Sequence, residues 1–158
     1  MTSLLSGGLL LLAALLFISC DQKRVFEEKA DIPNNNWTIN HVPEFTFTVP
    51  DTSQRYDIFF NIRHDLDYAF YNLYVRHTLL GPEQDVLSTL LHEIILLDKR
   101  TGKPKGKGSG GVFDYQVRGL RDQKFPRPGP YVLKVQQYMR RDPLPGILAI
   151  GIRVEKAL

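Results

Sequence analysis

An alternation of apolar and polar residues with a period of two most constrains how this 158-residue chain folds, and it recurs after Trp37. Successive side chains of a β-strand point to opposite faces, so the pattern predicts strands with one buried face. Turn residues separate the runs at 50–51, 81–82, 128–130 and 143–146. We expect these side chains to point inward: Phe45, Phe47, Val49, Tyr56, Ile58, Phe60, Ile62, Tyr71, Leu73, Val75, Tyr131, Leu133, Val135, Met139, Leu148, Ile150, Ile152 and Val154. The sequence therefore predicts an all-β fold, an antiparallel β-sandwich of about seven or eight strands.

One segment, 85–97, is ambiguous. Its apolar residues also form a stripe at helical spacing, made of Val86, Leu87, Leu90, Leu91, Ile94 and Ile95. The β-branched pair Ile94 and Ile95 and the strands on either side favour a strand over a helix.

The chain begins with an apolar run from Leu4 to Ile18 that ends just before Cys20, the only cysteine, and a polar sequence follows. A transmembrane helix needs about 20 apolar residues, whereas the apolar part of a signal peptide needs about 7 to 15. The layout is typical of a bacterial lipoprotein signal, which is cut before a cysteine that then carries lipid. A lone cysteine cannot form an intramolecular disulfide, which fits this use. An uncut anchor or a buried helix is the alternative.

These features predict the domain organisation. Residues 1–19 are expected to be a cleavable signal peptide helix, 20–36 a polar lipidated tether and 37–158 the sandwich domain. Two or three acyl chains on Cys20 would hold the protein stably at a membrane of the cell envelope. What remains is long enough for one domain with its own core.

The basic character of the chain is local. The formal net charge is +3, but the segment 99–111 holds five basic residues, without which the charge would be −2: Lys99, Arg100, Lys103, Lys105 and Lys107. Such a run is usually a solvated turn, and contact with lipid headgroups, glycans or an acidic partner is the alternative. An exported protein seldom meets nucleic acid, so no nucleic-acid partner is expected.

A His-Glu pair, His92 and Glu93, invites comparison with the zinc motif in which two histidines lie four residues apart. Position 96 is Leu96, so the second ligand is missing. We therefore expect the pair to lie at a strand edge, or to be partly buried with its hydrogen bonds satisfied, and we expect no metal site.

Three glycines, Gly106, Gly108 and Gly111, match the spacing of a dinucleotide-binding fingerprint. That motif works at the first turn of a helix. Here an alternating sequence follows, with Phe113, Tyr115 and Val117 on one face. The glycines are better explained by a hairpin loop.

Other polar residues suggest no reaction. His64, Asp65 and Asp67 could form a base or a calcium site, but such a group between strands is usually a polar loop, and calcium takes about six to eight oxygens. No serine lies in a nucleophile elbow. The sequence therefore predicts no catalytic, metal or cofactor-binding residues and no small-molecule substrate. Tyr74 and Tyr138 lie opposite the inward face and are candidates for exposed contacts, including stacking on carbohydrate.

Several stretches together resemble the gliding motility lipoproteins called GldH of the Bacteroidota. These stretches are "SCDQKRVFEE" followed by "IPNNNW", then "YDIFFNIRHDLDYAFYNLYV", "GKPKGKGSGG" and "FPRPGPYVLKVQQYMRRDPLPGILAIGIRVEK". The last stretch keeps three features of the family in the same order and spacing. These are the Phe-Pro and Gly-Tyr entrance, "QQYMR" at Gln136 to Arg140, and "LPGI" before "GIRVE". The resemblance covers nearly all of residues 20–158.

The resemblance implies a membrane-anchored accessory lipoprotein of the gliding and protein-secretion machinery, which faces the periplasm, more often from the outer membrane than from the inner. Its partners would be other gliding motility lipoproteins and envelope secretion components, and it would not be an enzyme. Only Cys20, as the lipid attachment site, transfers from the family to a named residue. A lipid-anchored glycan-binding module is the alternative function.

Overall fold

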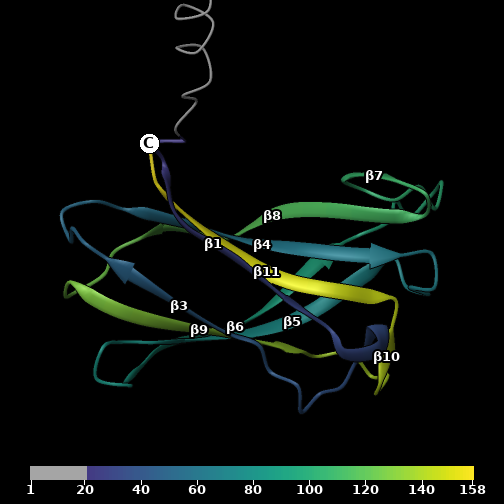
Figure 1. The fold of residues 1–158 in the computed structure, drawn as a ribbon, viewed down its shortest axis with the longest axis horizontal. Helices are drawn as coiled ribbons and strands as arrows, with labels where there is room; N and C mark the ends of the chain where they lie inside the picture. Colours follow the sequence, from purple (N-terminus) through teal and green to yellow (C-terminus); the bar gives the residue numbers. More distant parts are fainter. Residues whose placement is uncertain (1–20) are drawn as a thin grey trace, which may run out of the picture.

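Between residues 21 and 158, eight long strands and three short ones carry nearly all the regular structure. The computed structural model describes residues 21–158 (Figure 1). The strands are β1 (Arg24–Asp31), β2 (Asn36–Trp37), β3 (Glu44–Val49), β4 (Tyr56–Asp65), β5 (Asn72–Leu80), β6 (Val86–Ile95), β7 (Lys107–Ser109), β8 (Val112–Gln123), β9 (Gly129–Gln137), β10 (Leu144–Pro145) and β11 (Ile147–Lys156), with a 3-10 turn η2 at Pro33–Asn35. The predicted all-β fold is confirmed.

The strands form two main antiparallel sheets that pack face to face. The first sheet has the order β1-β11-β4-β8-β7 and the second has the order β3-β9-β5-β6, while β2 and β10 pair separately. In Figure 1, β8, β4 and β11 lie in the upper part of the view and β3 and β9 in the lower part. The ambiguous segment is strand β6, so the prediction of a strand is confirmed.

Alternate side chains of both sheets fill the space between them. On β3 the burial follows the predicted alternation without a break, with Phe45, Phe47 and Val49 buried. Trp37 is also fully buried, and its indole Nε1 donates a hydrogen bond of 2.7 Å to the carbonyl oxygen of His41. The period-two pattern therefore fills one continuous core.

A cluster of aromatic rings closes one end of the sandwich. Phe125, in the loop between β8 and β9, lies 4.5 Å from Tyr131, 5.5 Å from Tyr56 and 5.8 Å from Phe47, measured between ring centroids. All three contacts have edge-to-face geometry, which aromatic pairs prefer. Because these rings come from both sheets, the cluster ties the sheets together at this end.

The predicted tether is wrong over most of its length. Residues 24–31 form β1, which pairs along its length with β11, for example Glu28 with Ile152. The polar composition had suggested a tether, but an edge strand of a sheet is commonly charged. The folded domain therefore begins at Arg24 rather than at Trp37.

Two residues expected to point inward do not. Tyr71 precedes β5 and is 39% exposed. On β11 the register shifts between Ile147 and Ala149, so both of these are buried and Leu148 is only half-buried. A bulge of this kind adds one residue to a strand and reverses the face of the residues before it, which a strict period of two cannot anticipate.

Strand pairing defines the two ends of the sandwich. At one end, which we call the near end, β1 begins and β11 finishes. Arg24 lies opposite Glu155 there, and Lys156 lies opposite Tyr56 at the start of β4. At the opposite end, which we call the far end, β4 finishes, with Asp65 opposite Val112. Figure 1 shows the start of β1 and the C-terminus side by side at the near end. Between residues 21 and 158, no helix is both long and apolar enough to cross a membrane.

Gly146 provides a test of the close packing at the far end. Its φ is +83°, and a Cβ atom there would lie 2.3 Å from the backbone nitrogen of Tyr68, whereas Gly102 has φ +68° and open space around it. We expect Gly102→Ala to cost about 1 kcal/mol, from backbone conformation alone. Gly146→Ala should cost at least about 3 kcal/mol, because backbone must also move.

Urea unfolding followed by the fluorescence of Trp37, the only tryptophan, measures both free energies. Equal losses for the two variants would show that the contact between Gly146 and Tyr68 does not constrain the fold.

Candidate functional site

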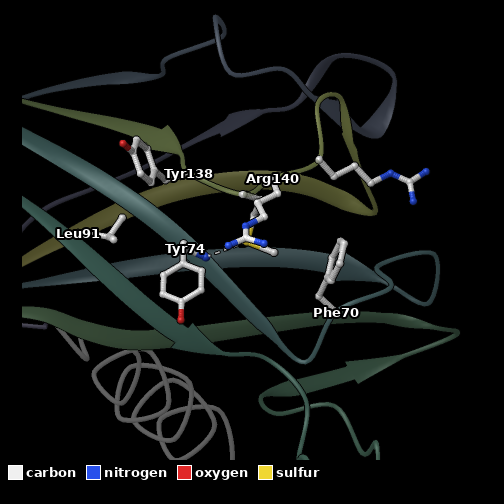
Figure 2. Close-up of a pocket in the computed structure, with 7 residues that line it drawn as sticks. Phe70, Tyr74, Leu91, Tyr138 and Arg140 are labelled. Atoms are coloured by element: carbon white, nitrogen blue, oxygen red, sulfur yellow. Dashed lines mark hydrogen bonds between the residues drawn. The ribbon is translucent and has the colours of Figure 1, made fainter.

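A groove lies on the outer face of the second sheet, at the far end. Its volume is about 600 Å³. We call it the distal groove. It is lined by Phe70, Tyr74, Leu91, Tyr138, Met139, Arg140 and Arg141. Figure 2 shows the Arg140 side chain extending between the rings of Tyr74 and Phe70 in this view.

Three neighbouring segments bring the lining residues together. Tyr74 lies on the outer face of β5, and Leu91 lies on the same face of β6, opposite Arg76. The chain leaving β9 is held against β5, because the backbone nitrogen of Tyr138 donates to the carbonyl oxygen of Tyr74 at 2.8 Å. The backbone nitrogen of Tyr74 in turn lies 3.3 Å from the sulfur of Met139. The groove is therefore formed by β5 and β6 together with the loops before β5 and after β9, and these hydrogen bonds hold the second loop against β5.

Arg76 holds one wall of the groove in place. Its guanidinium lies 5.1 Å from the centroid of the Tyr138 ring, a cation–π contact. One of its nitrogens donates to Oε1 of Gln136 at 2.6 Å, and Gln136 donates to the carbonyl oxygen of Ile39 at 2.9 Å. This chain of contacts fixes the orientation of Tyr138, so its exposed ring is a rigid surface.

The charge of the groove is mainly positive. Arg140 and Arg141 are exposed, and neither forms an ion pair within residues 21–158. The nearby carboxylate of Glu93 accepts a hydrogen bond of 2.8 Å from the amide of Asn72. Partial burial, together with Glu93, raises the pKa of Tyr74, which stays protonated at neutral pH. The groove thus offers aromatic faces, a thioether and two arginines, which suit binding.

Strand β6 leaves apolar side chains exposed beside the groove. Among residues 21–158 it is an edge strand, paired only with β5. The exposed fraction is 52% for Leu91, on the outer face, and 54% for Leu90, which lies opposite buried His77 on the inner face. Val86 and Leu87 are also exposed. The edge of the sheet is therefore apolar on both faces.

The predicted pair of His92 and Glu93 does not act as a unit. Neighbours on a strand point to opposite faces. His92 points into the core, with its ring 5.0 Å from the ring of Phe60, whereas Glu93 points outward to Asn72. No cluster of three or more possible metal-binding side chains occurs in the described part of the chain.

Instead, His92 belongs to a buried chain of polar groups that sequence reasoning missed. Nδ1 of His77 lies 2.7 Å from Nε2 of His92, and Nε2 of His77 lies 3.0 Å from the hydroxyl of Ser88. One proton lies between the two rings, so the pair is neutral when each ring carries a single proton. The signal was available, because His77 has the same parity as the inward-facing Leu73 and Val75.

His64, Asp65 and Asp67 do not converge on a site. His64 is fully buried and stacks on Phe113 at 5.6 Å between centroids. Asp65 instead accepts a hydrogen bond of 2.9 Å from the backbone nitrogen of Asp67, as in a turn. The expectation of a polar loop therefore holds only for Asp67, in the turn after β4, whereas His64 and Asp65 lie on the strand itself.

The glycine-rich segment forms a hairpin, as predicted. Lys107–Ser109 pair with the start of β8 around Gly110 and Gly111. Its five basic residues are exposed, and one makes a specific contact: the Lys99 ammonium lies 4.5 Å from the centroid of the Tyr71 ring. Cys20 and the signal peptide lie outside the described residues.

Comparisons with known proteins converge on one family. Residues 24–154 match the family model described as GldH lipoprotein. A protein of Christiangramia forsetii named "Gliding motility lipoprotein GldH homolog" is 31% identical, over 99% of both chains. "Gliding motility lipoprotein GldH" of Flavobacterium johnsoniae is 30% identical, over 96% of both chains. Among solved structures, one of infectious bursal disease virus aligns with 83% of this chain and 29% of its own, at 8% identity and a TM-score of 0.36, too low to support an argument.

The buried histidines predict a specific dependence of stability on pH. Burial lowers the pKa of His77 from 6.5 to about 4, and the neighbouring His92 is the second cause of this shift. The unfolded chain therefore takes up this proton first as the pH falls, so the stabilisation is complete above pH 6.5 and is lost down to about pH 4. Between pH 7.5 and 4.5 the loss should be about 2 to 3 kcal/mol.

The variant His77→Gln, which keeps a donor and an acceptor, removes this titration. We expect it to be less stable than the wild type at pH 7.5 and the difference to shrink by about 2 kcal/mol at pH 4.5. Urea unfolding at several pH values measures both curves. Parallel curves for the two proteins would contradict the prediction.

Proposed function

Because this chain belongs to the GldH lipoprotein family, we propose that it is a lipid-anchored accessory protein of the gliding motility and associated secretion machinery that acts by binding partner proteins. One observation carries the proposal. The distal groove and the exposed apolar residues of β6 form a continuous surface that holds five of the eight exposed large apolar side chains of residues 21–158.

The position of this surface relative to the anchor supports the proposal. Cys20 is the proposed lipid attachment site, and only residues 21–23 separate it from β1. Asp21 pairs with Arg153, and the carbonyl oxygen of Lys23 accepts a hydrogen bond of 2.9 Å from Lys156. The near end of the sandwich would therefore lie at the membrane, and the distal groove at the opposite end would face the periplasmic space. We propose that the membrane is the outer membrane.

A glycan-binding role is the second candidate, and one observation favours it. Tyr74 and Tyr138, which sequence reasoning selected for exposed contacts, both line the distal groove. Aromatic faces with nearby polar groups suit stacking on sugar rings. Lys99, from the basic segment, lies over Tyr71 close to the same region. A glycan array that gives no signal above background with folded protein would remove this candidate.

The role of Cys20 can be tested directly in cells. Cys20→Ala should abolish the incorporation of labelled palmitate and the stable membrane attachment that two or three acyl chains provide. Ser19→Ala is the matched control, because it keeps the cysteine and a small residue before it. A Cys20→Ala protein that stays in the salt-washed membrane fraction, with full motility, would overturn the anchor.

The binding role predicts specific neighbours in the envelope. Crosslinking in intact cells, followed by purification, should enrich other gliding motility lipoproteins or secretion components. An unrelated β-sandwich carrying the same residues 1–23 is the control for proteins captured only through the membrane. Equal capture by this control, or normal gliding and secretion after deletion of the gene, would contradict the proposal.

A further inference from the structure

The four sheet edges of this sandwich are protected very unequally. Edge strand β1 has five charged residues among its eight. On the other side of the same sheet, β7 has only three residues, and the part of β8 that it leaves unpaired carries Arg118, Arg121 and Asp122 and two register shifts. Edge strand β3 has six residues and lies between Pro43 and Pro50. Short length, charge and proline are the usual means of preventing an edge from pairing with another chain. Three of the four edges in the described sheets therefore carry such protection.

Strand β6 is the exception. It has ten residues, contains no proline, lysine or arginine, and has a single carboxylate, Glu93. Its sequence, "VLSTLLHEII", is strongly apolar for an exposed edge. An exposed edge of this length and composition is suited to pairing with a further strand.

The exposed leucines show what kind of partner fits. Leu90 faces the inner side of the sheet and Leu91 the outer side, and about half of each is exposed. Partner atoms on one face would cover only one of the two. An added strand has side chains on both faces in alternation, so it would cover both leucines at once.

Charge indicates the composition of that strand. Arg140 and Arg141 line the groove on the outer side without an ion pair in residues 21–158, while Arg76 holds Tyr138 nearby. The carboxylate of Glu93 keeps its charge, because its hydrogen-bond donor, the amide of Asn72, is neutral, so this single negative charge on β6 faces three arginines. The outer side beside β6 therefore has unmatched positive charge, which carboxylates of a partner would neutralise.

We propose that β6 and the distal groove bind an extended, acidic peptide segment of a partner protein, which adds to the second sheet as a fifth strand. This deepens the proposed function and rests on it. Alternate side chains of the segment lie over Leu90 on the inner side. The remaining side chains enter the groove, with carboxylates at Arg140 and Arg141 and apolar groups against Tyr74 and Leu91.

A second copy of this chain fits the surface less well. Pairing between two β6 strands would match apolar residues, but each β6 would add a single carboxylate, Glu93. It would also bring a second set of the same arginines to the assembly. The charges therefore favour a different protein with an acidic segment.

Binding can be measured with a defined probe. The probe is a fluorescent ten-residue peptide of alternating valine and glutamate, and the matched probe has lysine in place of glutamate. Full-length lipidated protein in detergent micelles should bind the acidic peptide in an anisotropy assay and bind the basic one at least ten-fold more weakly. Equal binding of both peptides would overturn the proposal.

Charge-reversal variants locate the contact. Arg140→Glu together with Arg141→Glu should weaken binding of the acidic peptide roughly ten-fold or more. Arg121→Glu together with Lys124→Glu makes the same change of charge at the near end and should leave binding within two-fold. A similar loss for both pairs would show non-specific attraction and contradict the assignment.

Backbone methylation tests strand addition itself. Two acidic peptides are N-methylated at alternate residues, in opposite phases, so that only one presents its methyl groups to β6. One phase should bind and the other should not. Equal affinity of the two methylated peptides would overturn the proposal. So would a protein that binds a glycan at this surface but no peptide, or one that binds no peptide and instead forms a dimer that Leu90→Asp abolishes.

A crosslinking experiment separates this inference from the proposed function. A photo-crosslinking residue replaces Leu91 or Arg121 in otherwise wild-type, motile cells. The Leu91 position should capture a segment rich in aspartate and glutamate, identified by mass spectrometry. Capture from position 121 alone would overturn the assignment of the groove as the binding site but would agree with the proposed function of binding partner proteins. Capture of no protein from either position would contradict both the groove assignment and the proposed function.

Discussion

The pairing of β1 with β11 is the constraint on which the rest of the structure depends. Strand β11 lies between β1 and β4, with Ile150, Ile152 and Val154 fully buried, so it is an interior strand of the first sheet. Pairing with this strand makes β1 part of the folded domain. It also places the N-terminal side of the domain beside the C-terminus, and leaves three residues between β1 and the proposed lipid at Cys20.

The same constraint separates the ends of the sandwich. The aromatic cluster around Phe125 closes the near end, where the chain enters, and the loops that carry Phe70 and Arg140 lie at the far end. A surface built from those loops and from β5 and β6 is therefore directed away from the proposed anchor. Attachment and recognition are assigned to opposite ends of one small domain, which suits a component that connects a membrane to a protein assembly.

Particular elements show how far sequence patterns reach. The alternation in "EFTFTV" predicts the buried face of β3 in full, because every residue there follows the ideal geometry. The alternation on β11 misplaces Leu148, because a bulge inserts one residue. Similarly, Tyr74 and Tyr138 could be assigned to the outer face from their parity. Arg140 and Arg141 could not be assigned to the groove, since their position depends on how the loop after β9 returns across β5.

By itself, the sequence determined the all-β class, the inward face of most strands and the signature of a lipoprotein, since these depend on residue types and local spacing. Only the tertiary structure decided which strands are edges, because strand order is a property of long-range pairing. It therefore decided that β6 is unprotected and that β1 is not a tether. It also brought His77, Ser88 and His92 together, because periodicity defines the face of a side chain but not its neighbour across the sheet.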